Sequence, residues 1–113
     1  MAGSLRQYSS SESNNAALGQ AGSVFATGNV TITPASGIFV AITMIATTKF
    51  DALTPEDGLG KQYVSSTTAS DSGTGGQAIT TGGSGTEFPE GLTIYGRWSE
   101  INLNDGTIIA YLG

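Results

Sequence analysis

The stretch that decides the fold lies at the carboxyl end, where residues 92–112 read LTIYGRWSEINLNDGTIIAYL. β-Branched and aromatic residues dominate it, and such residues suit the pleated, half-buried surface of a strand. Asp105-Gly106 divides the stretch, and an Asp-Gly pair between two strand-like runs is typical of a two-residue hairpin turn. We therefore expect paired strands over 92–104 and 107–112, with a bulge or close backbone approach at Gly96.

The predicted hairpin fixes which side chains share a face. A two-residue loop pairs Asn104 with Thr107, and strand alternation then gives one apolar and one mixed face. The apolar face consists of Ser99, Ile101, Leu103, Ile108, Ala110 and Leu112. The mixed face holds the only tryptophan of the chain, and its members are Trp98, Glu100, Asn102, Ile109 and Tyr111. We expect the amino-terminal arm or another subunit to cover the mixed face.

Two further strands are predicted upstream of this hairpin. Residues 23–33 alternate between two sets of side chains, which is the pattern of a half-buried strand, and a turn follows over 33–37. Residues 38–48 have two largely apolar faces, which predicts a central strand covered on both sides. A helix over 38–46 is the alternative, which the β-branched content and the preceding Pro and Gly disfavour.

The remaining segments carry weaker patterns. Residues 50–63 are predicted to be a connection with turn signals, after which a short strand over 61–64 is left open. Residues 65–87 are a Gly/Ser/Thr-rich region that predicts a long surface loop, interrupted by a short strand over 77–81. Residues 1–22 are polar and without period, which predicts an extended arm. The whole is predicted to be all-β: one antiparallel sandwich or barrel over 23–113, of about six to eight strands.

Composition excludes several classes of protein. The chain has 113 residues, a net charge of −5, 12% charged residues and neither cysteine nor histidine. It therefore has no disulfide, no cysteine-ligated metal and no histidine base. Four basic residues against nine acidic ones predict no nucleic-acid partner. The longest apolar run, residues 38–46, is less than half of the about 20 residues that span a membrane, and residues 1–15 lack the apolar core of a secretory signal.

Several motifs of the sequence could carry chemistry, but each fits a structural role better. The glycine-rich residues 73–85 match neither a phosphate loop nor a dinucleotide fingerprint. One acidic group could bind calcium, and its members are Asp51, Glu56 and Asp57. A second could cleave a glycosidic bond, and its members are Glu87, Glu90 and Glu100. Both groups are better explained as solvated turns. Serine or threonine nucleophiles lack a histidine base, although a lysine could replace it. We predict no catalytic residue, no metal and no cofactor.

Arg97 lies in the most apolar part of the chain, where a guanidinium must pair or stack. We expect a structural pair with Glu90 or Glu100, or stacking on Tyr95 or Trp98, in preference to a contact with a ligand.

The chain's closing residues resemble those of a known class of proteins. FPEGLTIYGRW at 88–98 followed by IIAYLG at 108–113 is similar to the ending of small virion proteins of tailed bacteriophages, notably marine cyanophages. The resemblance covers about the last quarter of the chain. It implies a non-enzymatic structural protein, made in the host cytoplasm and located in the virion. The favoured role is a head decoration (cement) protein, a homotrimer on the capsid surface that binds the major capsid protein at subunit junctions and stabilises the head.

Three alternatives stay open at this point. A tail- or fibre-associated virion protein would share this ending, and a small hydrolase is the weakest alternative. A carbohydrate-binding module would present Tyr95, Trp98 and Tyr111 as an exposed aromatic platform. The candidate residues for contacts with the capsid or with other copies are Tyr8, Leu18, Tyr95, Arg97, Trp98, Ile109 and Tyr111.

Overall fold

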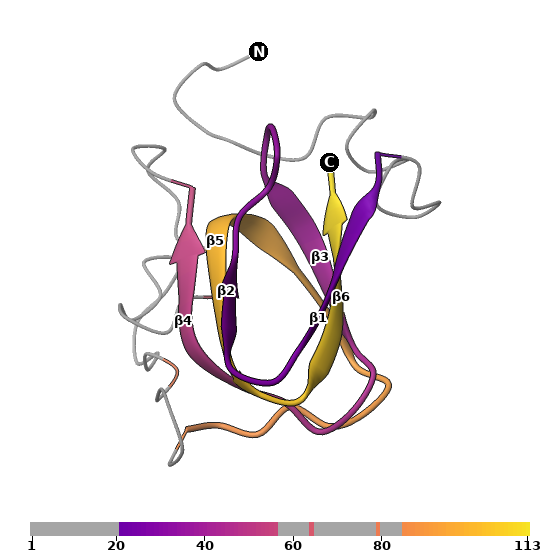
Figure 1. The fold of residues 1–113 in the computed structure, drawn as a ribbon, viewed down its shortest axis with the longest axis vertical. Coiled ribbons are helices and arrows are strands. Elements are labelled where there is room, and N and C mark those ends of the chain that lie inside the picture. The colour runs from indigo at the N-terminus through magenta and orange to yellow at the C-terminus, as the bar shows by residue number, and fades with distance from the viewer. Residues whose placement is uncertain (1–20, 57–63, 65–78, 80–84) are drawn as a thin grey trace, which may run out of the picture.

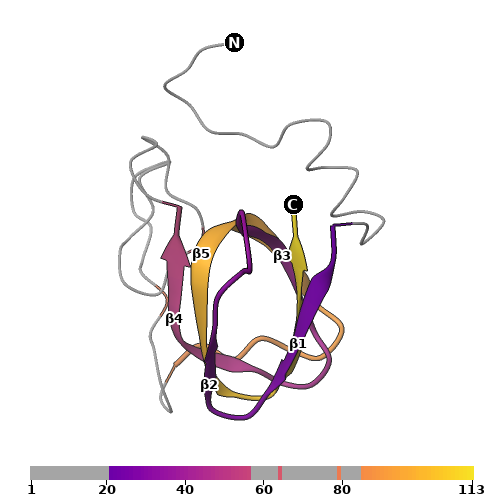
Figure 2. The ribbon, with the colours of Figure 1, turned by 45° about the horizontal axis from the view of Figure 1, so that its top comes forward.

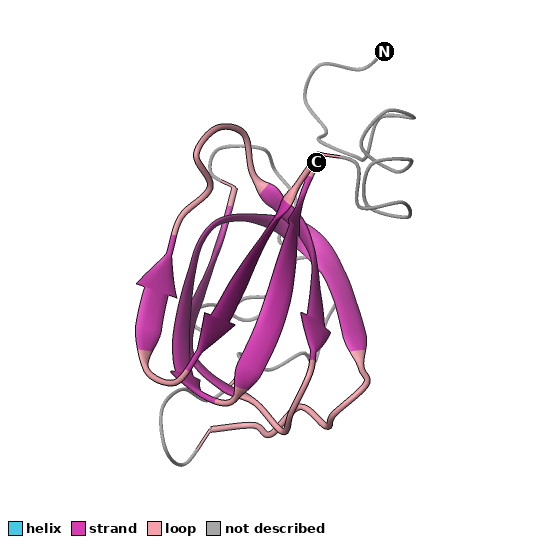
Figure 3. Cartoon of the chain, turned by 45° about the vertical axis from the view of Figure 1, so that its right-hand side comes forward, coloured by secondary structure: helices cyan, strands magenta, loops and turns pink. Residues whose placement is uncertain are grey.

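Strands make up most of the computed structural model, which describes residues 21–56, 64, 79 and 85–113 (Figure 1). In chain order the strands are β1 (Ser23–Thr27), β2 (Val30–Ile32), β3 (Phe39–Met44), β4 (Lys49–Pro55), β5 (Thr93–Asp105) and β6 (Thr107–Leu112). The described residues form strands and loops without a helix (Figure 3). The all-β prediction is confirmed, and the helical alternative for residues 38–46 is excluded.

One antiparallel sheet nearly closes into a barrel. Its strand order is β1-β6-β3-β5-β2, and β4 also pairs with β5. The long strand β5 joins two groups: its first half pairs with β3, and its second half pairs with β2 and β4. Figures 1 and 2 show β5 bending across the top of the barrel from one group to the other. This bend closes the fold around one core.

A bulge at Gly96 produces part of this bend. Phe39 pairs with Trp98 while Ala41 pairs with Tyr95, so one intervening residue of β3 faces two of β5. An extra residue on one strand increases local twist and bends the strand. A Cβ added to Gly96 would lie 2.6 Å from Cζ2 of Trp98, so only glycine fits here. The predicted bulge and close approach at Gly96 are confirmed.

The core fills the interior of the barrel. Its fully or almost fully buried members come from every strand except β2, and they are Ala26, Phe39, Ile42, Met44, Phe50, Leu53, Trp98, Ile101, Leu103, Ile108 and Ala110. Full burial of one large apolar side chain contributes about 1.5–3 kcal/mol to folding. Strand β3 lies between β6 and β5, and five of its six residues are buried. Its predicted central position is confirmed.

The predicted hairpin between residues 92–104 and 107–112 is wrong in its pairing. Strands β5 and β6 follow each other at Gly106, but β6 pairs with β1 and β3 and not with β5. The chain does turn sharply at Gly106, which has φ +112°. Because β5 curls across the barrel before this turn, β6 returns alongside β3. The predicted burial of Ile101, Leu103, Ile108 and Ala110 is nevertheless confirmed.

Two further expectations are corrected. Residues 50–63 were expected to be a connection, but β4 covers Lys49–Pro55 and pairs with β5 through Phe50 and Leu103. Register shifts within this pairing break the period-two pattern that identifies a strand from sequence. Residues 23–33 form two strands, because the chain turns at Gly28, whose φ is +78°.

Several predicted segments lie wholly or largely outside the described residues. They are the arm over 1–22, the strands over 61–64 and 77–81, and the loop region over 65–87. Within the last three of these segments the structure describes Val64, Ile79 and residues 85–87, and Val64 and Ile79 are partly buried against the core.

Candidate interaction surface

The candidate site is built from alternating side chains on four neighbouring strands. Strands β1, β6, β3 and β5 pair in that order, so residues at matching register positions form rows across the sheet. The side chains that point into the core are those of Val24, Ala26, Ile42, Met44, Ile94, Ile108 and Ala110. Because successive side chains of a strand point to opposite sides, the residues between them form an outer face.

Two rows define this outer face. The first row, from β1 to β5, is Phe25, Ile109, Thr43 and Thr93. The second row, in the same order, is Ser23, Tyr111, Ala41 and Tyr95. None of these eight residues carries a charge. The outer face is therefore a neutral, largely apolar and aromatic surface.

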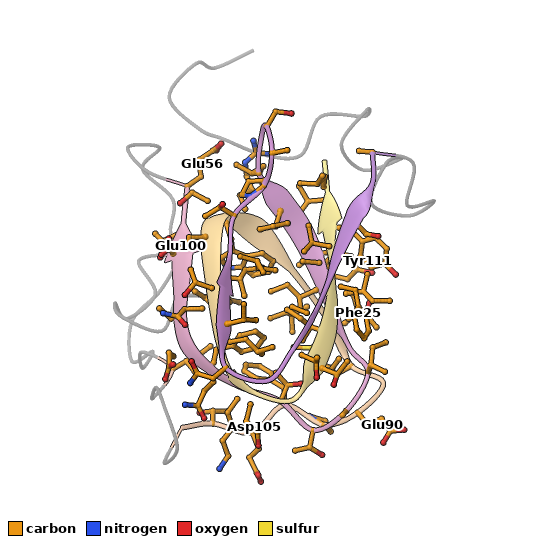
Figure 4. All side chains as sticks on the ribbon, viewed as in Figure 1. Phe25, Glu56, Glu90, Glu100, Asp105 and Tyr111 are labelled. Carbon is orange, nitrogen blue, oxygen red and sulfur yellow. The ribbon has the colours of Figure 1, made fainter. Side chains whose placement is uncertain are left out.

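The largest side chains of the outer face are open to solvent. Phe25 is 65% exposed and Tyr95 is 61% exposed. Ile109 and Tyr111 are half-buried, and Figure 4 shows Phe25 and Tyr111 on the same side of the barrel, pointing away from it. Nearby Ile45 adds a further exposed aliphatic side chain. A patch of exposed rings and aliphatic groups is what interaction sites present in a free subunit.

The centre of the outer face has few free polar groups. The hydroxyl groups of Thr43 and Thr93 hydrogen-bond to each other at 2.9 Å between their Oγ1 atoms. Hydroxyls that are paired within the chain no longer need a partner from water or from another protein. The middle of the outer face therefore presents mainly methyl groups to a partner and few free hydrogen-bonding groups.

The structure brings together three of the predicted interface residues and adds one. Tyr95, Ile109 and Tyr111 all lie on the outer face, Ile109 in the first row and the two tyrosines in the second. Phe25 was missed. Because Phe25 alternates with the inward-facing Val24 and Ala26, the sequence identifies it as outward-facing. Its place beside Ile109 depends on the β1–β6 pairing, which no local sequence pattern indicates. Two other candidates, Tyr8 and Leu18, lie outside the described residues.

The prediction that Trp98 is an interface residue on an exposed face is wrong. The side chain is fully buried in the core, and its Nε1 donates a hydrogen bond of 2.7 Å to the carbonyl oxygen of Val64. Register shifts in the pairings of β5 with both β3 and β4 change which residues point inward. The exposed platform of Tyr95, Trp98 and Tyr111 that a carbohydrate-binding module would use is therefore not formed.

Arg97 is only 2% exposed, so its prediction as an interface residue is wrong; it lies in a structural ion pair, as expected, but with a different partner. Its Nε donates to Oε1 of Glu56 at 2.9 Å, and its Nη2 donates to Oε2 at 3.4 Å. The predicted partners were Glu90 or Glu100. The register places Pro55 opposite Trp98, so Glu56, the next residue after Pro55, comes to lie beside Arg97.

The acidic clusters noted in the sequence are drawn into separate contacts. Oδ1 of Asp51 accepts a hydrogen bond from Nδ2 of Asn104 at 3.1 Å, while Glu56 binds Arg97. Glu87 lies 3.9 Å from Nζ of Lys49. In the described ranges, no three acidic residues are grouped as a metal site would require, and no helix there has the length and apolarity to cross a membrane.

Comparison of the chain with protein-family models, with curated proteins and with solved structures finds no match. The outer face and the composition are therefore the observations on which a function can be argued.

Proposed function

We propose that this chain is a non-enzymatic structural protein of a bacteriophage virion, and that it acts as a head decoration (cement) protein. The observation that carries the proposal is the outer face, where Phe25 and Tyr95 remain more than half exposed on an isolated chain. Exposed aromatic groups favour association with another protein surface, because burying them removes apolar area from water. In a virion, neighbouring subunits would provide that surface.

The composition supports a role in assembly more than a role in catalysis. Only 12% of the residues are charged, about half the share in typical soluble proteins, and Gly, Ser and Thr make up 45 of 113 residues. The buried ion pair of Arg97 with Glu56 joins β5 to the residue after β4, which is a structural role. Many weak contacts repeated by symmetry need a defined surface and do not need proton-transferring groups.

The proposal includes a partner and a location. The major capsid protein is the proposed partner at junctions between capsid subunits, and the chain would stabilise the head from its outer surface. This partner and this location are proposed from the resemblance of residues 88–98 and 108–113 to phage virion proteins. The same resemblance implies that three copies of the chain associate, and this homotrimer stays a prediction.

The test is immunogold labelling of purified particles of the phage that encodes the chain, with antibodies raised against the full purified chain. Label distributed over the heads is expected. Label confined to tails or fibres would move the chain to the tail- or fibre-associated role. Particles without label, with all of the protein in the soluble fraction of the lysate, would refute a virion role.

A further inference from the structure

The outer face has an internal order that the register makes explicit. In its first row the two large side chains, Phe25 and Ile109, lie on β1 and β6, and threonines follow on β3 and β5. In its second row Tyr111 lies on β6 and Tyr95 on β5. In each row, β6 carries a large residue and β3 a small one. The two outer strands, β1 and β5, also carry one large and one small residue in each row.

This order is self-complementary under one particular symmetry. A two-fold axis that runs parallel to the strands, between β6 and β3, places β1 over β5 of a second copy and β6 over β3 of that copy. The rows keep their height along the strands, so each residue faces the mirror-image position of the same row in the second copy: β1 faces β5, and β6 faces β3. The resulting pairs all join a large side chain to a small one: Phe25 with Thr93, Ile109 with Thr43, Tyr111 with Ala41, and Tyr95 with Ser23.

We infer that the outer face is the contact between two copies of this chain, related by this two-fold axis. The inference rests on the proposed function for the face and names its partner there. An interface with two-fold symmetry must match itself, and face-to-face sheets pack by interdigitation of their side chains. Large residues over small ones satisfy this requirement at the three positions where neither residue is buried within its own chain; at the fourth, Ala41 is only 2% exposed and contributes little to the contact.

Charge also favours a second copy over an unrelated partner. The chain carries a net charge of −5, so two copies repel each other at most orientations. The outer face has no charged side chain at its eight positions, so two copies meet there with the least repulsion. A basic partner would find no carboxylate among these residues to pair with.

The size of the face sets the concentration at which the contact should appear. Four strands about 4.8 Å apart and five residues long, at about 3.4 Å each, cover roughly 300 Å². Stable interfaces bury about 800 Å² on each partner, so this contact belongs to the weak class. Free chains should therefore associate only weakly, with a dissociation constant toward about 1 mM, whereas a high local concentration would favour the contact in an assembly.

Sedimentation equilibrium of the full chain up to 1 mM is the first test. The mass should rise from that of the 11.4 kDa chain toward twice that value. Phe25→Lys and Tyr95→Lys should each weaken association at least tenfold, because a charge would be buried against the second copy. Val30→Lys is the matched control, since Val30 is an exposed apolar residue on β2, outside the outer face, and it should associate like the wild type. Urea midpoints near that of the wild type will confirm that the variants fold.

An exchange of large and small residues tests the register itself. Phe25→Thr should weaken association, and Thr93→Phe should weaken it by placing two large side chains opposite each other. The double variant Phe25→Thr/Thr93→Phe restores a large residue over a small one and should recover most of the wild-type association. A double variant no better than Phe25→Thr alone would overturn the inferred symmetry.

Two other results would also overturn the inference. A chain that stays monomeric at 1 mM does not form this contact, and a mass three times that of the chain would replace the two-fold with the predicted homotrimer. Either result leaves the virion role standing where immunogold label covers the heads. An associating chain that is absent from particles would refute the virion role and leave the two-fold contact intact.

Discussion

The Nε atom of Arg97 lies 2.9 Å from Oε1 of Glu56, and only 2% of the arginine side chain and 19% of the glutamate side chain are exposed. The pair links β5 to the residue that follows β4, and the backbone N–H of Glu56 also donates to the carbonyl oxygen of Arg97 at 2.7 Å. A guanidinium this deeply buried depends on its carboxylate, because it has little access to water.

Glu56→Ala is therefore expected to lower the free energy of unfolding by about 2–3 kcal/mol. Removing one partner of a fully buried pair costs about 3–5 kcal/mol, and the partial exposure of the Glu56 side chain places the expected loss at or below the bottom of that range. Urea denaturation measures it. Glu100→Ala, on the partly exposed side of β5, is the control and should change stability by about 0.5 kcal/mol or less. Equal losses in the two variants would contradict a special role for the Arg97–Glu56 pair.

Trp98 provides an optical test of the core, because it is the only tryptophan in the chain. Full burial predicts that its fluorescence emission is shifted to shorter wavelength than in urea and that acrylamide quenches it poorly in the folded state. Trp98→Phe should destabilise the protein by about 1–3 kcal/mol, since it shrinks the core and leaves the Val64 carbonyl without this donor. Quenching of the native protein as strong as in urea would show that the indole is exposed.

The sequence predicts composition of the core better than it predicts pairing. Alternation within residues 99–112 correctly separates buried Ile101 and Leu103 from their neighbours, because side-chain alternation is a local property of a strand. The partner of each strand is a long-range property. The Asp105-Gly106 pair indicates a sharp turn, and the turn exists, but the curl of β5 carries the two strands apart.

The candidate surface was predictable only in part for the same reason. Ile109 and Tyr111 could be selected as surface residues from their strand phase, whereas Tyr95 shares the phase of buried Ile101 and Leu103 and faces outward only because of the bulge at Gly96. Trp98 was misplaced because two register shifts change the phase of β5 around it. Phe25 joins the face through a pairing between strands more than 80 residues apart in sequence, which no local pattern encodes.

Gly106 should be the least replaceable of the turn glycines that the structure describes. It has φ +112°, and an added Cβ would lie 2.5 Å from Oγ1 of Thr48 and 2.6 Å from the carbonyl oxygen of Thr47. Gly106→Ala combines a strained backbone with overpacking and is expected to cost about 3 kcal/mol or more. Gly91→Ala is the matched control, because Gly91 has φ +88° with open space around it; backbone strain alone should cost about 1–2 kcal/mol. Similar urea midpoints for both variants would contradict the close packing at Gly106.

Strand β4 is the element that the sequence did not predict, and Leu53 tests whether it belongs to the core. Leu53 is fully buried, whereas Leu92 is 37% exposed, so the two leucines form a matched pair for truncation. Leu53→Ala should lower the free energy of unfolding by about 2–5 kcal/mol, because the cavity it leaves lies inside the barrel. Leu92→Ala removes the same atoms from a partly solvated site and should cost about 1 kcal/mol. If both variants lost about 1 kcal/mol in urea denaturation, residues 49–55 would be a surface connection, as their sequence indicates, and the barrel would close without them.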